Sequence, residues 1–390
     1  MPFERSARLK KLPPYLFIEI DKKKKAAKAA GVDLVDLGVG DPDRPTPALL
    51  LKALAKASLK PENHQYPFGS GTMAFRQEIA GWFKKRFGVE LDAATEVCAT
   101  IGSKEAIGHF PLAFVDPGDV VLCPDPGYPV YEASTHFVGG EVVRMPLLEK
   151  NGFLPDLSAI PAEKLKKAKL MWLNSPNNPT AAVAPLAYLT KVVAFCRQHK
   201  IILAHDMAYS EIYYNGKKPA SVLQVPGAKD CAIEFHSLSK TFNMTGWRVG
   251  FAVGDASLIA GLAAVKGNLD SGVVSAIQEM AIAALKAPAS LTASIRKVYE
   301  KRRAYLVKAL TSLGYKVADP QAAFYLWIKV PTGFSSAAFC TELLDKAGIV
   351  ATPGNGFGPS GEGYFRLTLT APDARLKLAV KRLSAYAKGR

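Results

Sequence analysis

Two serines, a lysine and an arginine lie between Ser237 and Arg248, in a segment that joins two apolar runs. Cys231–Phe235 precedes this segment and Val249–Val253 follows it, which predicts a connection between two buried strands at the sheet's edge. A lysine among apolar neighbours loses its proton more readily, because burial disfavours the ammonium, and the free amine can attack a carbonyl carbon. Lys240 is therefore a candidate Schiff-base lysine. Taken alone, Lys240 fits a loop lysine that faces water better, as most lysines do, so the rest of the chain must supply the argument.

Polar loops follow the other strands that the sequence predicts. Apolar runs at Val97–Ile101, Val120–Cys123, Leu170–Leu173 and Ile201–Ala204 are separated by helical patterns, an order typical of a mainly parallel sheet covered by helices. Ligands of such sheets bind at the carboxyl ends of the strands. The loops at those ends contain Gly102, Ser103, Lys104, Tyr128, Asn178, Asp206 and Tyr209.

These side chains complement an aldehyde that carries a pyridine ring and a phosphate. Asp206 can keep the ring nitrogen protonated, Tyr128 can stack on the ring, and Tyr209 and Asn178 can donate to the ring oxygen. Hydroxyls, N–H groups and a cation for the phosphate come from Gly102, Ser103, Ser237, Ser239 and Arg248. Each residue also has a simpler explanation: Asp206 as a helix cap, Asn178 as a turn residue before proline, Tyr128 as a surface aromatic. Their joint placement after successive strands favours one shared site.

Composition narrows the class of protein. The chain has 390 residues, 49% of them hydrophobic, and no apolar run long enough to span a membrane, so we expect a two-domain protein without membrane association. The five cysteines are scattered, without paired spacing or neighbouring histidines, and the N-terminus is charged; we expect a cytoplasmic protein without a metal site. The net charge of +16 is spread along the chain, which favours solvated helix faces over nucleic-acid binding. A DNA-binding regulator is the alternative, but we expect no helix-turn-helix before Gly38.

The order of elements predicts two domains of different construction. Helices are expected at Leu12–Ala30, Pro47–Ser58, Thr72–Phe87 and, as a long charged helix, at Ser294–Leu313. After that helix come a strand, a helix, a second strand and a closing helix, at Phe324–Val330, Ser336–Ala347, Tyr364–Leu369 and the C-terminus. We therefore expect a large domain at 46–285 and a small α+β domain at 286–390, which the N-terminal segment 1–45 joins.

Four separated motifs resemble a known family. Ser237-x-Ser239-Lys240 with Arg248 eight residues later, Asn177-Asn178-Pro179-Thr180, Asp206-x-x-Tyr209 and Tyr364-Phe365-Arg366 are similar, in type and order, to motifs of the class I/II pyridoxal-phosphate aminotransferases of fold type I. The resemblance covers essentially the whole chain. It implies an α/β fold: a large domain with a mainly parallel, seven-stranded sheet covered by helices, plus a smaller α+β domain.

The resemblance also implies roles for individual residues. Lys240 would bind pyridoxal 5'-phosphate as the internal aldimine and shuttle the substrate proton, with Asp206 and Tyr209 as the other catalytic residues. Arg366 would bind the substrate carboxylate with its planar fork. The other implied cofactor contacts are Gly102, Ser103, Lys104, Tyr128, Asn178, Ser237, Ser239 and Arg248. Tyr66 would reach the phosphate of the other subunit in a homodimer with shared active sites. The other implied substrate contacts are Tyr15, Gly40, Tyr128 and Asn178.

Longer segments, including Leu12–Phe17, Leu37–Asp43, Ile101–Glu105 and Glu234–Trp247, are similar to the LL-diaminopimelate aminotransferase subgroup. That subgroup makes LL-diaminopimelate from tetrahydrodipicolinate and glutamate, on the route to lysine. Two positions depart from the family pattern, Ser175 and Ala181. An aspartate, alanine or aromatic aminotransferase would share the same catalytic residues and remains the alternative, followed by a C–S lyase of the same fold.

Overall fold

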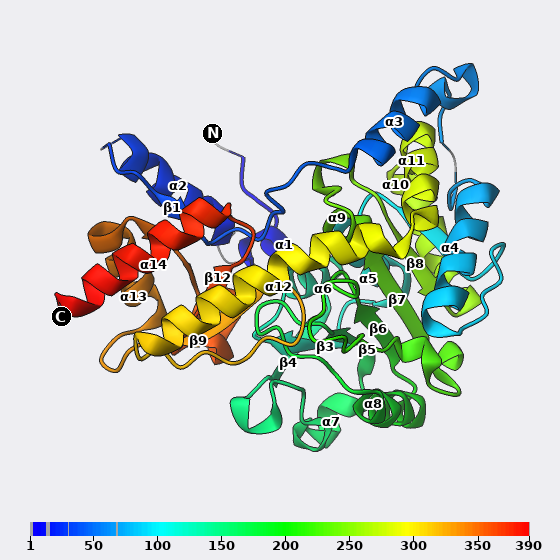
Figure 1. Cartoon of the computed structure of the whole chain (residues 1–390). Helices are drawn as coiled ribbons and strands as arrows, with labels where there is room; N and C mark the ends of the chain where they lie inside the picture. Colours follow the sequence, from blue (N-terminus) through cyan, green and yellow to red (C-terminus); the bar gives the residue numbers. More distant parts are fainter. Residues whose placement is uncertain (1–2, 13–15, 30, 68, 390) are drawn as a thin grey trace.

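A computed structural model describes residues 3–12, 16–29, 31–67 and 69–389. Figure 1 shows two groups of elements, a larger one around a central sheet and a smaller one that contains the C-terminus, with the long helix α12 (Ala289–Ser312) running along both. Among the described residues, no helix combines the length and the apolar character that a membrane span requires.

The central sheet has seven strands in the order β2-β8-β7-β6-β5-β3-β4. All neighbouring strands are parallel except that β8 is antiparallel to both β2 and β7. The mainly parallel sheet that the sequence pattern predicts is therefore confirmed, and so are the seven strands that the family resemblance implies. The strands are β2 (Val97–Thr100), β3 (Val120–Asp125), β4 (Glu141–Pro146), β5 (Ala168–Asn174), β6 (Ile202–Asp206), β7 (Ala232–Ser237) and β8 (Gly250–Gly254).

Helices cover both faces of this sheet because successive strand residues point to opposite faces. In β5, Leu170 and Trp172 belong to one apolar cluster and Met171 and Leu173 to another. The first cluster packs against α5 (Ser103–Phe114), α6 (Val130–Phe137) and α10 (Ala256–Leu269). The second packs against α4 (Met73–Phe87), α8 (Leu186–His199) and α11 (Ser275–Lys286).

The smaller group of elements has its own apolar core. Its antiparallel sheet has the order β11-β12-β9, with α13 and α14 packed nearby. The N-terminal strand β1 (Val35–Asp36) pairs in parallel with β10 (Ile349–Val350), which joins the N-terminal segment to this core. The remaining elements are β9 (Tyr325–Lys329), β11 (Thr352–Pro353), β12 (Tyr364–Thr368), α13 (Ser336–Ala347) and α14 (Asp373–Lys388).

The helix ends differ from the prediction at three places. The expected helix Leu12–Ala30 is described as α2 (Leu16–Ala29), and residues 13–15 lie outside the described residues. A separate short helix, α1 (Ala7–Lys10), was not predicted; Ser6 caps it through the N–H of Leu9. Helix α12 begins at Ala289 rather than Ser294, because Pro288 precedes it and fits a helix N-terminus. Helix α3 (Ala48–Ala57) lies within its predicted range.

Candidate active site

The segment between β7 and β8 forms one wall of a cavity of about 220 Å³. Strand β7 ends at Ser237, whose Oγ accepts a hydrogen bond from Ser239 N (3.2 Å) and so caps the short helix α9 (Leu238–Thr241). Ser237, Ser239 and Lys240 all line the cavity. The predicted connection between two buried strands is thus present, and its polar residues face a shared space.

Lys240 is the half-buried amine of this cavity. Its Nζ donates to Gly40 O (3.3 Å) and lies 5.8 Å from the centroid of the Phe324 ring. Burial lowers the pKa of Lys240 to about 8; Arg248 and Arg366 add to this effect, and Asp41 opposes it. The fraction of Lys240 that is a free amine is therefore larger than that of an exposed lysine at the same pH.

Asp206 is a buried carboxylate at the carboxyl end of β6, 5% exposed, that lines the same cavity. Its Oδ2 accepts from Tyr131 Oη (2.7 Å), and its Oδ1 accepts from Ala208 N (3.1 Å). Burial raises the pKa of Asp206, and the hydrogen bond from Tyr131 opposes this rise. Both donors are neutral, so neither supplies a positive charge to balance the carboxylate. A cation in the cavity would stabilise the anionic carboxylate.

The turn after β2 and the segment before β8 approach each other closely. Gly102 has φ +71°, and a Cβ at this position would lie 2.6 Å from Arg248 Nη2. Arg248 donates to Thr245 O (3.0 Å). Ser239, which lines the same cavity, has a buried Oγ with no hydrogen-bond partner among the described residues. The first N–H groups of α5, a guanidinium and an available hydroxyl therefore surround a space that suits an anion.

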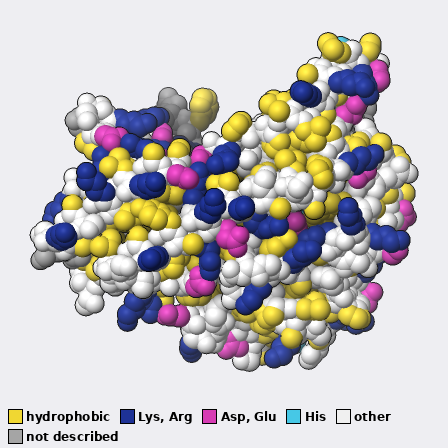
Figure 2. Space-filling view, in the orientation of Figure 1, with side chains coloured by type: hydrophobic (Ala, Val, Ile, Leu, Met, Phe, Trp, Pro, Cys, Tyr) yellow, Lys and Arg dark blue, Asp and Glu magenta, His cyan; other side chains and the backbone are white. Residues whose placement is uncertain are grey.

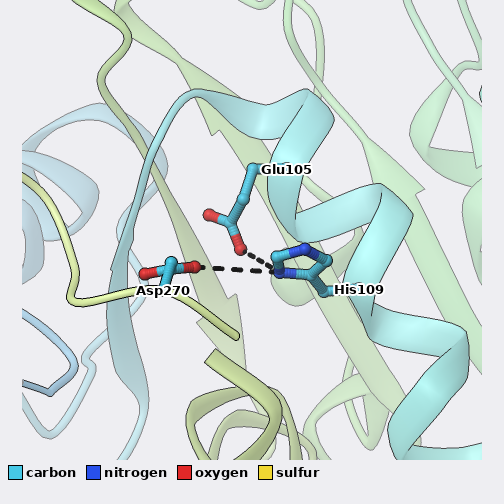
Figure 3. Close-up of side chains that lie close together, drawn as sticks. All are labelled: Glu105, His109 and Asp270. Atoms are coloured by element: carbon cyan, nitrogen blue, oxygen red, sulfur yellow. Dashed lines mark ion pairs between the residues drawn. The ribbon is translucent and has the colours of Figure 1, made fainter. Parts of the chain in front are cut away.

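A charged network holds the outer side of this turn. Figure 3 shows the carboxylates of Glu105 and Asp270 on the same side of the His109 ring, whose Nδ1 lies 2.7 Å from Glu105 Oε1 and 3.8 Å from Asp270 Oδ2. The three residues could supply metal ligands, but Lys266 Nζ already lies 2.9 Å from Glu105 and 3.2 Å from Asp270. Burial alone would raise the pKa of Glu105, yet His109 and Lys266 hold it below its usual value. Glu105 Oε2 also accepts from Ile101 N (2.9 Å), which ties the network to the turn.

Arg366, in the middle of β12, reaches the cavity from the smaller group of elements. Its Nη1 donates to Asn178 Oδ1 (2.7 Å) and its Nη2 to Gly38 O (2.6 Å). Its Cζ lies 4.2 Å from the centroid of the Tyr325 ring. The side chain is 1% exposed, and its Nε has no hydrogen-bond partner within the described part of the chain. A carboxylate in the cavity would complete the bonding of this guanidinium.

Most of the residues predicted for the site line this one cavity. Gly40, Ser103, Lys104, Tyr128, Asn178, Asp206, Tyr209, Ser237, Ser239, Lys240, Arg248 and Arg366 all do so. Gly102 contributes through its contact with Arg248 rather than as lining. Tyr66 does not join them within this chain: it is 74% exposed. Tyr15 lies outside the described residues.

Several residues of the site were not predicted from the sequence. Asn174 lines the cavity, and its Oδ1 accepts from Asn178 N (2.8 Å). Tyr325 also lines the cavity and shares a hydrogen bond with Tyr209 (Oη–Oη 2.8 Å), and Tyr131 binds Asp206. Asn174 carried a usable signal, because it is the last residue of a strand that precedes a recognised motif. The two tyrosines lie inside a helix and a strand, where their sequence pattern is that of core residues.

The fold brings a half-buried amine, a buried carboxylate and groups suited to anions into one cavity, and comparison with known proteins identifies the class. The chain belongs to the aminotransferase class I and II family, whose model matches residues 32–383. It is 56% identical over 384 residues (98% of this chain, 99% of the relative) to the LL-diaminopimelate aminotransferase of Nitratidesulfovibrio vulgaris strain Miyazaki F. It is 55% identical over 381 residues (98% of each chain) to the enzyme of the same name from Aquifex aeolicus. The substrate-bound BacF structure from Bacillus subtilis superposes with a TM-score of 0.95 at 35% identity, covering 99% of this chain and 98% of BacF.

Class I and II aminotransferases depend on pyridoxal 5'-phosphate, and the residues of this cavity fit that cofactor. A buried carboxylate with only neutral donors suits a protonated ring nitrogen, and an available buried Ser239 Oγ suits a phosphate oxygen. Because Gly102 has no side chain, the backbone of this turn can lie close to Arg248. A phosphate-binding turn needs this close approach of backbone N–H groups and a cation. The cofactor and fold expected from the resemblance are thus confirmed at the level of the family.

Proposed function

We propose that this chain is an LL-diaminopimelate aminotransferase that converts tetrahydrodipicolinate and glutamate into LL-diaminopimelate and 2-oxoglutarate. The observation that carries the proposal is the identity of more than half of all positions, over nearly the full length, to two enzymes of that name. The cavity supports it with an amine, a buried carboxylate and a buried guanidinium in one space.

The residues in and beside the cavity are candidates for binding the cofactor. We propose that Asp206 holds the ring nitrogen, Tyr209 and Asn178 the ring oxygen, and Tyr128 the ring face. The phosphate would lie among Gly102, Ser103, Lys104, Ser237, Ser239 and Arg248. Support comes from the shared cavity lining and from the available hydroxyl of Ser239. When bound, pyridoxal phosphate supplies an electron sink for the substrate carbon.

Substrate binding and proton transfer are proposed to be the work of side chains of this protein. Arg366 binds the substrate α-carboxylate with its fork, beside Asn178 and the backbone of Gly40, and so orients the substrate Cα toward Lys240. The free amine of Lys240 then accepts the proton from that Cα and would deliver it to the cofactor carbon that keeps the amino nitrogen. A pKa of about 8 suits this work, because a base and its conjugate acid are both populated near neutral pH.

The complete enzyme is proposed to be a cytoplasmic homodimer with shared active sites. Figure 2 shows hydrophobic side chains on the projecting segment around α3, where Leu49, Leu51 and Leu59 are 53%, 38% and 80% exposed. Tyr66 follows in the same segment, so a partner that covers this surface would meet Tyr66 as well. We also propose the domain limits 1–45, 46–285 and 286–390. One apolar core, with buried members between Leu50 and Leu285, supports the limits of the large domain. The core of the smaller group also includes residues of the large domain, such as Ala181, Tyr209 and Tyr214.

A donor-panel assay tests the substrate. With 2-oxoglutarate as acceptor, we expect LL-diaminopimelate to yield glutamate with a kcat/KM at least about 100-fold above that of aspartate, alanine or phenylalanine, since losing a polar contact that a buried site is built to make is costly. Equal or better turnover of one of those amino acids would instead indicate a general aminotransferase. Release of pyruvate and ammonia from cystathionine would indicate a C–S lyase.

A further inference from the structure

Tyr325 brings a second phenol to the phenol of Tyr209. The two Oη atoms lie 2.8 Å apart, the residues are 3% and 7% exposed, and both line the cavity. A tyrosine hydroxyl has one proton and two lone pairs. When one hydroxyl of such a pair donates to the other, the second keeps its own proton for a further acceptor. The pair therefore offers one O–H to whatever oxygen occupies the cavity.

The ring of Tyr325 is held from several sides. The Arg366 guanidinium lies over one part of it, with Cζ 4.2 Å from the ring centroid. The Tyr209 ring meets it edge to face, at 5.5 Å and 76°. A Cβ on Gly40 would clash with Tyr325 Oη, so the backbone of that loop closes a third side. These contacts hold the Tyr325 hydroxyl within hydrogen-bonding distance of the Tyr209 hydroxyl.

We propose that Tyr325 is a positioning residue: its hydroxyl donates to Tyr209 Oη, which leaves the Tyr209 proton directed at the ring oxygen of the cofactor. This inference rests on the cofactor placement given under the proposed function. Donation to Tyr209 also makes it a stronger donor, because hydrogen bonds in a chain polarise one another. Tyr325 would thus act on the chemistry through Tyr209, without touching the reacting atoms.

Tyr209 and Tyr325 both stay protonated, chiefly because both phenols are buried. Arg366 approaches from β12, Asp206 from β6 and Asp41 from the N-terminal segment, while Lys240, on α9, lies beside Phe324. Burial raises the pKa of Tyr325, which Arg366 opposes, and burial raises the pKa of Tyr209 well above its ordinary value. Both hydroxyls are therefore donors at the pH values at which lysine-based chemistry occurs.

Replacing Tyr325 by phenylalanine removes one hydroxyl and keeps the ring under Arg366. The readout is the visible absorbance of the enzyme-bound cofactor as a function of pH, which requires no turnover. Without the donor, the Tyr209 proton neutralises less charge on the ring oxygen, and that oxygen holds a neighbouring proton more tightly. We expect the titration midpoint to rise by about half to one pH unit, the equivalent of one ordinary hydrogen bond. We also expect kcat to fall by about three- to tenfold, with KM changed by less than about twofold.

Tyr299→Phe is the matched control, because Tyr299 is 2% exposed, packs on Phe324 at 5.3 Å and lies outside the described lining of the cavity. This control should keep the wild-type midpoint. A midpoint for Tyr325→Phe within about 0.2 pH units of wild type, or an equal shift in the control, would overturn the proposal.

A double-mutant cycle decides between action through Tyr209 and a general structural effect. In a Tyr209→Phe background, Tyr325→Phe should cause no further shift, whereas an undiminished second shift would contradict the proposal. Tyr209→Phe alone, which does not depend on the folding of a Tyr325 variant, should shift the midpoint in the same direction, and a wild-type midpoint in Tyr209→Phe would also overturn the proposal. These spectra do not depend on the amino acid that the enzyme uses, so a failure of the proposed substrate would leave them unchanged and would appear only in the donor panel.

Discussion

Lys240 and Lys104 both line the cavity, but their surroundings differ. Lys104 is exposed at the start of α5, whereas Lys240 is half-buried, with an aromatic ring nearby and two arginines in the same space. Burial penalises the ammonium of Lys240 and leaves a free amine at a pH where an exposed lysine remains protonated. Lys240 and Lys104 have the same side chain, so their environments must distinguish them. The environment of Lys240 is the reason that we propose it as the reactive lysine.

The lowered pKa of Lys240 predicts how the cofactor-free enzyme captures pyridoxal phosphate. Only the free amine attacks the aldehyde, and its fraction increases as the pH rises through about 8. The second-order rate of absorbance gain should therefore rise with pH to a plateau, with a midpoint near pH 8. A midpoint near 10.5, the ordinary value for lysine, would show that burial does not control this amine.

Arg366 predicts a loss of substrate affinity that leaves the cofactor in place. An Arg366→Lys variant keeps a charge but cannot make the two parallel hydrogen bonds of the fork to a carboxylate. Loss of one charge-assisted hydrogen bond should raise KM for the amino donor by about 10- to 100-fold. The cofactor absorbance band should persist in the variant. Steady-state kinetics identical to wild type would place the carboxylate elsewhere.

At the residue scale, the residues with specific chemistry were predicted from the sequence. The tyrosines whose hydroxyls support those residues from inside a helix or strand were not. Lys240 and Asp206 were identifiable because a lysine and a carboxylate in apolar surroundings need partners, whereas Arg366 was identifiable only through the resemblance of its motif to a known family. Tyr131 and Tyr325 were not, because a tyrosine in a helix or strand usually belongs to the core. Only the structure shows that their hydroxyls meet Asp206 and Tyr209.

At the element scale, the site depends on how strands end. Strands β2, β5, β6 and β7 finish at the same edge of the sheet, so residues from separate parts of the sequence meet there. This arrangement was predictable, since strand and helix patterns alternate clearly along the chain. The positions of helix ends were less so: the segment Ala289–Ala293 carries no charge and gives little periodic signal, yet it begins α12.

The turn at Gly102 gives a prediction with an internal control. Gly102→Ala places a methyl group 2.6 Å from Arg248 Nη2 at φ +71°, so both the backbone and the guanidinium must shift. We expect the Kd for pyridoxal phosphate to rise by about tenfold or more, the equivalent of one charge-assisted hydrogen bond. Gly108→Ala, in the helix that follows this turn and with nothing within 4 Å of the new Cβ, should bind the cofactor like wild type. Equal Kd values for both variants would contradict the phosphate-cradle assignment.

At the scale of the whole molecule, the segment around α3 is the surface that a second copy of the chain is proposed to cover. Leu59 is 80% exposed there, so burial in a dimer would make a charge at this position costly. In sedimentation, wild type should have twice the 41.9 kDa chain mass, and Leu59→Asp should shift it toward one chain. Leu186→Asp, at a 45% exposed leucine on α8, is the control and should remain dimeric. A monomeric wild type, or an unchanged Leu59→Asp, would reject this interface.

Reductive trapping of the cofactor tests most directly which amine carries it. Borohydride fixes pyridoxal phosphate to the nitrogen that holds it, and peptide mass spectrometry then locates the added mass. The label should lie on the peptide that contains Lys240, and Lys240→Ala should abolish both the label and the yellow absorbance. A label on Lys104, or an unchanged label in Lys240→Ala, would contradict the assignment of Lys240.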